Sequence, residues 1–156
     1  LHSAESPMLR FLIIAHAPLA SALKAVAAHI DADAAESIEV CDVTANQSQD
    51  ELVGIASAAL DRLGPGEVLI FADVFGATPC NAARRLAERP STRVVAGVNI
   101  PALWRALGHR SESVDRVAEL AVSGGQQGLM HVSVTRPQYQ AIKHNPDDSQ
   151  HDHHQQ

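Results

Sequence analysis

The stretch of sequence that decides the fold class is residues 68–79, which read VLIFADVFGATP. Its first five residues are all apolar, as expected for a short strand covered on both faces in a parallel sheet. Asp73 ends this strand, and Thr78 and Pro79 then have the cap-and-proline form of a helix start. The stretch therefore predicts a strand, a turn and a helix, the repeating unit of an α/β domain.

Short apolar runs and longer segments of helical period alternate on both sides of this stretch. The predicted strands are residues 9–15, 37–43, 68–72, 93–98 and 129–135. The predicted helices are residues 19–30, 49–63, 78–88, 102–107 and 113–123. This alternation predicts a three-layer α/β sandwich with a mainly parallel sheet. We expect the common strand order 2-1-3-4, with the last strand added as a fifth, antiparallel strand at an edge.

Length and composition fit a single domain and exclude several classes of protein. The chain has 156 residues, a net charge of −6 and few aromatic residues. Because no basic run is present, nucleic acid and anionic membranes are not expected as main partners. No apolar run approaches the roughly 18 residues that span a bilayer. Two cysteines, Cys41 and Cys80, are too few for a disulfide framework, so we expect a reducing, cytoplasmic location.

Composition divides the chain into three parts. Residues 1–7 are expected to be an extension or a tag remnant, because they lack the basic and apolar regions of a signal peptide. Residues 8–136 are expected to form the domain. Residues 137–156 are rich in His, Asp and Gln, and we expect them to be disordered. The tail histidines are interpreted as part of a solubilising segment rather than a metal site: His151, His153 and His154.

Two residues with complementary chemistry follow neighbouring strands of the predicted sheet. His16 ends the first strand and Asp73 ends the third. Since adjacent strands lie about 4.8 Å apart, the imidazole and the carboxylate can share a hydrogen bond. A carboxylate that accepts the Nδ1–H of a histidine leaves Nε2 as a lone pair for nucleophilic attack. The pair therefore predicts a nucleophilic histidine at the carboxyl edge of the sheet.

The turn after the third strand is a candidate anion cradle. Gly76, Ala77 and Thr78 lead into a helix N-terminus, where unpaired backbone N–H groups favour a phosphoryl group. A second helix begins after His16 and is expected to add another positive end. A nucleophilic histidine beside such a cradle predicts phosphoryl transfer through phosphohistidine. We expect no metal and no cofactor.

Each of these residues also has a simpler structural explanation. A histidine at a strand end is more often a hydrogen-bonded structural residue, and an aspartate there is more often a cap or turn residue. The main support for a site is that all the features fall on one edge. Four further residues are interpreted as packing or solvated positions rather than site residues: Cys41, Cys80, Arg84 and Arg85. Trp104 is interpreted as packing, with a place on a docking face as the alternative.

Residues 8–135 resemble the mannose-family enzyme IIA component of the bacterial sugar phosphotransferase system. The resemblance rests on IIAH at residues 13–16, DVFGATPCNAA at 73–83 and VAGVNIP at 95–101. It implies that the phosphocarrier protein HPr phosphorylates His16 and that Asp73 is its hydrogen-bonding support. It also implies that a IIB component accepts the phosphoryl group, and that membranes are involved only through IIC and IID partners.

The resemblance further implies a homodimer in which the last strand is exchanged, with glycines before Leu129 supplying the slack. Asn99 is expected beside the site as a lesser contributor. The chain departs from the family at Ala17, followed by Pro18, and at Ala77, where glycines are usual. A methyl group at these places is expected to narrow the pocket and to limit positive φ.

Three other functions remain as alternatives. A receiver domain phosphorylated on Asp73 needs an acidic pair after the first strand, where this chain has His16 and Ala17. A tetrapyrrole metal chelatase needs further ligands facing the cleft, and His109 is the one candidate. A regulatory module that senses its phosphorylation state uses the same histidine and differs in what receives the signal.

Overall fold

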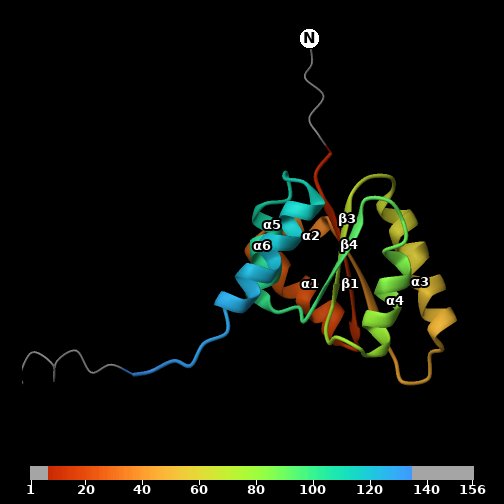
Figure 1. Cartoon of the computed structure of the whole chain (residues 1–156), viewed down its shortest axis with the longest axis horizontal. Coiled ribbons are helices and arrows are strands. Elements are labelled where there is room, and N and C mark those ends of the chain that lie inside the picture. Colours follow the sequence, from red (N-terminus) through yellow and green to blue (C-terminus); the bar gives the residue numbers. More distant parts are fainter. Residues whose placement is uncertain (1–6, 135–156) are drawn as a thin grey trace, which may run out of the picture.

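The computed structural model of the chain describes residues 7–134 (Figure 1). Strands and helices alternate along this range, as predicted. In chain order they are β1 (Arg10–His16), α1 (Leu19–Ile30), α2 (Ala32–Glu36), β2 (Ile38–Val43), α3 (Gln49–Leu63), β3 (Val68–Ala72), α4 (Thr78–Leu86), β4 (Thr92–Ala96), α5 (Ile100–Gly108) and α6 (Val114–Gln127). Residues 1–6 of the expected extension at 1–7, and the whole of the expected tail at 137–156, lie outside the described residues.

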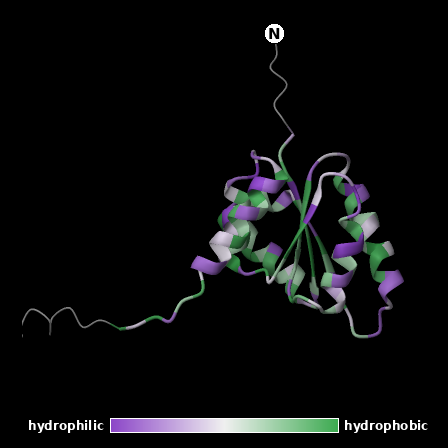
Figure 2. Ribbon diagram, in the orientation of Figure 1, coloured by the Kyte–Doolittle hydropathy of each residue, from purple (hydrophilic) through white to green (hydrophobic). Residues whose placement is uncertain are grey.

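The four strands form one parallel sheet in the order β2-β1-β3-β4, which confirms the predicted order. Helices α1, α2, α5 and α6 cover one face, and α3 and α4 cover the other (Figure 1). Figure 2 shows apolar residues turned toward the sheet and polar residues on the outer sides of the helices. The three-layer sandwich is therefore present, and the carboxyl ends of its strands share one edge.

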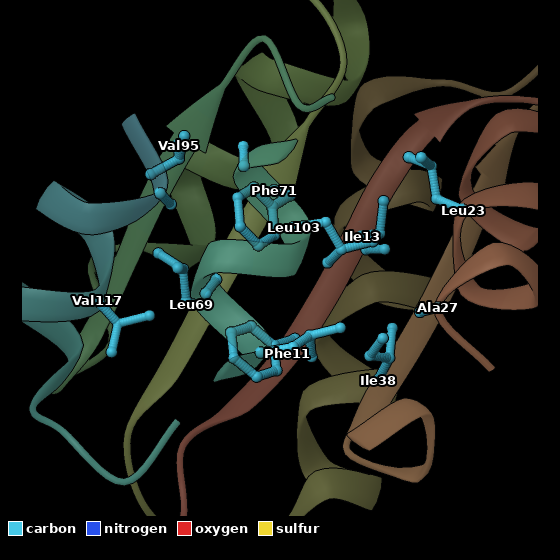
Figure 3. Close-up of a cluster of buried hydrophobic side chains, with 14 of the residues drawn as sticks. Phe11, Ile13, Leu23, Ala27, Ile38, Leu69, Phe71, Val95, Leu103 and Val117 are labelled. Atoms are coloured by element: carbon cyan, nitrogen blue, oxygen red, sulfur yellow. The ribbon is translucent and has the colours of Figure 1, made fainter. Parts of the chain in front are cut away.

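The side chains of β1 alternate between the two apolar cores. Phe11 and Ile13 point into the core beneath α1, α2, α5 and α6, where Phe11 lies next to Phe71 with ring centroids 6.3 Å apart (Figure 3). Leu12 and Ile14 point into the opposite core, beneath α3 and α4. Because the alternation has a period of two, His16 follows Leu12 and Ile14 and falls on the α3–α4 side.

The part of the predicted fifth strand that the structure describes, residues 129–134, does not form a strand. Residues 129–134 leave α6 without joining the sheet and run away from the body of the domain, and Thr135 lies outside the described range (Figure 1). The apolar side chains of this segment are exposed: Leu129, Met130, Val132 and Val134. No strand within residues 7–134 pairs with this segment.

The glycines before this segment have a different role from the predicted one. Helix α6 continues through Gly124 and Gly125 instead of ending at residue 123. A Cβ atom on Gly124 would lie 2.9 Å from Cβ of Arg105, and one on Gly128 would lie 2.2 Å from Cγ of Pro101. These positions therefore allow α5 and α6 to pack closely, rather than supplying slack.

None of the helices within residues 7–134 combines the length and apolar character needed to cross a membrane.

Candidate functional site

The structure brings His16 and Asp73 together at the carboxyl edge of the sheet. His16 is the last residue of β1, and Asp73 follows the neighbouring strand β3. The ring atom Nδ1 of His16 lies 2.7 Å from Oδ2 of Asp73, so the predicted hydrogen bond is present. The backbone N–H of His16 donates to the same oxygen at 2.9 Å. Two bonds to one oxygen fix both the position and the tilt of the ring.

The arrangement leaves one ring nitrogen free. An ionised carboxylate can only accept hydrogen bonds, so Nδ1 of His16 carries the proton and Nε2 carries the lone pair. The side chain of His16 is 57% exposed, whereas that of Asp73 is 7% exposed. The carboxylate is therefore largely buried at the carboxyl ends of the strands, whereas the imidazole of His16 is accessible to another molecule.

Asp73 is held as a carboxylate by its neighbours. Burial by itself raises the pKa of this carboxyl group, but donors around it outweigh burial. The backbone N–H and the ring of His16 donate to it, and the backbone N–H of Val74 donates to Oδ1 at 2.9 Å. The net effect is that the pKa of Asp73 lies below its ordinary value.

This lowered pKa predicts how the stability of the protein depends on pH. A carboxyl group whose pKa is lower in the folded protein than in the unfolded chain stabilises the fold. The stabilisation is complete above the pKa of the unfolded chain, which is about 3.9 for aspartate. It is lost as the pH falls through the lower pKa of the folded protein. We therefore expect the difference in unfolding free energy between the wild type and Asp73→Asn to be constant from pH 7 to about 5 and to shrink below about pH 4. Urea unfolding measured at each pH checks this, and a difference that grows on acidification contradicts it.

The turn after Asp73 provides a helix end without a protein cap. Gly76 has a φ of 83°, which favours glycine, and Ala77 occupies the N-cap position of α4. The sequence predicted Thr78 as the cap, but Thr78 is the first helical residue. The methyl group of Ala77 cannot accept a hydrogen bond, and Pro79 has no N–H. The backbone N–H groups of Thr78 and Cys80 are therefore left for an anion.

The two alanines that depart from the family pattern cause no backbone strain. Ala77 has a φ of −81°. Ser91 is the only non-glycine residue with a positive φ among residues 7–134, so Ala17 does not have a positive φ either. The expectation that a methyl group limits the backbone at these two positions is therefore wrong for this chain, because neither position needs a positive φ.

The N-terminus of α1, which was the second helix end predicted to attract an anion, already has a carboxylate of the protein beside it. The carboxylate of Asp42, on β2, accepts the backbone N–H of Ser21 at 3.1 Å and also the hydroxyl group of Ser21. Asp42 thus caps the first turn of α1, where its negative charge offsets the helix dipole. An anion at His16 is therefore expected to depend on α4 rather than on α1.

Asn99 has a structural role. Its Oδ1 accepts the backbone N–H of Ala102 at 2.9 Å and caps α5, and its Nδ2 donates to the backbone oxygen of Gly125 at 3.0 Å. Within residues 7–134 no hydrogen bond joins it to His16. The loop before it does reach the site, because the N–H groups of Gly97 and Val98 donate to the backbone oxygen of Ala72.

Sequence reasoning missed an apolar rim around His16. Phe75 is 77% exposed, and Val74 and Leu19 are also exposed. Val74 and Phe75 directly follow Asp73 in the turn after β3, and Leu19 is the first residue of α1, three positions after His16. The available signal was the pair of large apolar residues, Val74 and Phe75, in a turn where polar residues are usual.

Other candidate residues lie away from this edge or inside the core. Cys41 and Cys80 are buried and unbridged, as expected. His109 lies near the amino ends of the strands, opposite His16. The backbone oxygen of the next residue, Arg110, accepts the backbone N–H of Leu9, which precedes β1. The chelatase alternative thus loses its second ligand, and the residues the structure describes contain no cluster of His, Cys, Asp and Glu that could hold a metal.

Comparisons with known proteins agree with this geometry. Residues 10–122 match the EIIA-man family, described as the fructose IIA component of the phosphotransferase system (PTS). The mannose-specific EIIAB component of the PTS from Escherichia coli K12 is 33% identical over 98 residues. That alignment covers 60% of this chain and 30% of the E. coli protein, so the chain spans less than a third of that relative's length.

Solved structures show the same fold. The mannose/sorbose-specific IIA subunit from Enterococcus faecalis is 25% identical, with a TM-score of 0.76, over 83% of this chain and 98% of that one. The EIIA component from Streptococcus agalactiae is 21% identical, with a TM-score of 0.71, over 80% and 97% of the two chains. With a family match over most of the chain, the protein belongs to the EIIA-man family of the phosphotransferase system.

Proposed function

We propose that this protein carries a phosphoryl group in a bacterial sugar phosphotransferase system, accepting it from HPr on His16 and passing it to a IIB component. The observation that carries the proposal is the hydrogen bond from Nδ1 of His16 to Asp73 at 2.7 Å, beside a ring that is 57% exposed. A nucleophile that must meet the side chain of another protein has to be both oriented and accessible, and His16 has both properties.

The transfer step follows from this geometry. The Nε2 lone pair of His16 attacks phosphorus, and the new N–P bond forms as the bond between phosphorus and the donor side chain of HPr breaks. The donor side chain recovers the electron pair of that bond. The carboxylate of Asp73 keeps the proton on Nδ1 and stabilises the positive charge that develops on the ring. The phosphoryl oxygens face the uncapped N-terminus of α4.

The apolar rim supports transfer between proteins rather than to water. Phe75, Val74 and Leu19 offer exposed apolar surface around the histidine. A partner that packs against this surface would exclude water from the N–P bond, which strengthens the electrostatic interactions at the site. The same contact would bring the partner's nucleophile into line with phosphorus.

Reconstitution with purified proteins tests the proposal. The protein is mixed with phosphoenolpyruvate, enzyme I and HPr, and intact-mass spectrometry measures the addition of one acid-labile phosphoryl group. We expect labelling that requires HPr and that is lost when a cognate IIB protein is added. If the protein is labelled but no IIB protein removes the phosphoryl group, the regulatory alternative is favoured. If the protein is not labelled at all, both the carrier function and the regulatory alternative are excluded.

We also propose that the protein forms a homodimer through residues 129–134. Strand β4 pairs with β3 alone within the described residues, so its outer edge is open. A cleft of about 260 Å³ lies between β4 and α6, lined in part by Val95, Val122 and Leu129. The exposed apolar residues of the segment match such an edge, because a strand from a second copy would satisfy both the backbone groups and the cleft.

Charged substitutions in the segment test the dimer. We expect the full chain to elute as a dimer in size-exclusion chromatography with light scattering, and the double variant Val132→Asp, Val134→Asp to elute as a monomer. An aspartate at either position would bring unpaired charge into the apolar interface. Ile55→Asp, at an exposed position on α3, is the matched control and should remain dimeric. A monomeric wild type would contradict the proposal.

A further inference from the structure

A second cleft lies on the α3–α4 side of the molecule, apart from the histidine. Its volume is about 530 Å³, within the range of small-molecule sites. It is lined by one residue of α3, three residues of α4 and one residue just after α4: Gln49, Asn81, Arg84, Arg85 and Glu88. Neither His16 nor Asp73 is among them. The family match does not assign a role to this cleft, and the side chains that line it determine which ligands it can bind.

Arg84 is the first of two nitrogen donors in this cleft that have no partner. Six other arginines within residues 7–134 pair with a carboxylate. In that range no carboxylate lies within 4 Å of Arg84, which is exposed on α4. Its guanidinium group is therefore available to an anion from solution.

The amide of Gln49 is the second such donor. Its Nε2 atom is buried and has no hydrogen-bond partner among the described residues. A buried N–H donor left unpaired is unfavourable, so such a group in a native structure requires an explanation. A small rotation of this side chain toward the cleft would let it donate to a ligand oxygen.

The remaining residues of the cleft can adjust to a ligand. Arg85 donates to Asp50 at 2.8 Å, but the Asp50 side chain is 88% exposed and free to turn away. Asn81 donates to the backbone oxygen of Gly76 across a long 3.4 Å contact. Glu88 is the one carboxylate lining the cleft, and it follows the last residue of α4, Leu86, by two positions. Donors thus outnumber acceptors, and they favour phosphoryl or carboxylate oxygens.

We propose that the α3–α4 cleft is a second binding site, for a small anionic metabolite that carries phosphoryl or carboxylate groups. Arg84 anchors the anion, Arg85 and Gln49 add donors, and Glu88 limits its affinity. The site does not depend on phosphorylation of His16. It adjoins the turn beside that residue, because Asn81 contacts Gly76.

Titration of the full chain with inorganic pyrophosphate, followed by ¹⁵N NMR, tests this site. We expect shifts of the Arg84 Nε–H and of the Gln49 side-chain amide. Arg84→Gln should weaken binding by about tenfold, as the loss of one charged hydrogen bond implies. Glu88→Gln should strengthen binding, because a like charge is removed. Arg116→Gln, which removes another exposed helical arginine, on α6, is the control and should leave binding unchanged.

Four results would overturn the proposal. The first is no saturable binding in the millimolar range. The second is a set of shifts confined to the amides of Thr78 and Cys80, which would place the anion at α4's N-terminus alone. The third is equal weakening by Arg84→Gln and Arg116→Gln, which would indicate general charge attraction. The fourth is weaker binding by Glu88→Gln. The amide spectrum of each variant shows whether it has folded, and Arg84→Lys should retain part of the affinity.

Discussion

His16→Ala should take up no phosphoryl group from phosphorylated HPr. In the proposed transfer the imidazole supplies the atom that forms the N–P bond, so its removal should eliminate the reaction rather than weaken it, and we expect the rate to fall at least ~10³-fold. The substitution should leave the fold intact, because the side chain is exposed and, among residues 7–134, only Asp73 contacts its ring by a hydrogen bond. Intact-mass spectrometry of the reconstituted mixture measures the uptake.

The chain offers a closely matched control for this experiment. Nδ1 of His109 lies 2.6 Å from Oε2 of Glu112, so this histidine also has a carboxylate partner and a free Nε2. It lies near the amino ends of the strands, and the helix that follows it, α6, is capped by the side chain of Ser113. His109→Ala should therefore be phosphorylated at the wild-type rate. Labelling of His16→Ala, or loss of labelling in His109→Ala, would move the acceptor away from His16.

The central part of the fold was predictable because its strands are buried. The apolar runs around Ile13 and Phe71 can only be covered on both faces, and the helices between them have clear periodicity. The pairing of His16 with Asp73 was predictable for the same reason, since parallel neighbouring strands end at one edge. These predictions needed only local patterns and the usual strand order.

The features that sequence reasoning missed depend on contacts between distant elements. Helix α2 has five residues, too few for a periodic pattern, and the side chain of Asp31 caps it. The capping of α1 by Asp42 requires the register between β1 and β2, in which Ala15 lies opposite Asp42. Gly124 was interpreted as a helix end because glycine is a poor helix former, but its missing side chain is what lets α5 approach.

Replacing Asp73 by asparagine tests the other half of the site. Asparagine has the same shape but a single acceptor, whereas Asp73 uses both oxygens: Oδ2 accepts from His16 twice, and Oδ1 accepts from Val74. The NH₂ group of the asparagine must therefore face one of these donors. The substitution also removes the negative charge that is proposed to support the phosphorylated ring. Because hydrogen bonds to charged groups contribute about 1.5–3 kcal/mol, we expect phosphorylation to slow by roughly 10- to 100-fold.

The tautomer of the His16 ring shows whether Asp73 acts by orienting this ring or only by supporting the fold. The ¹⁵N shifts of the His16 imidazole should report a proton mainly on Nδ1 in the wild type and a mixture of tautomers in Asp73→Asn, because the neutral amide no longer requires that proton. Asp42→Asn is the control: it also removes a carboxylate near this edge, but its contacts are with Ser21, so the rate and the tautomer should be unchanged. If both variants slowed transfer equally while the tautomer stayed fixed, Asp73 would act only through the general charge of this edge, and the orienting hydrogen bond would not contribute to transfer.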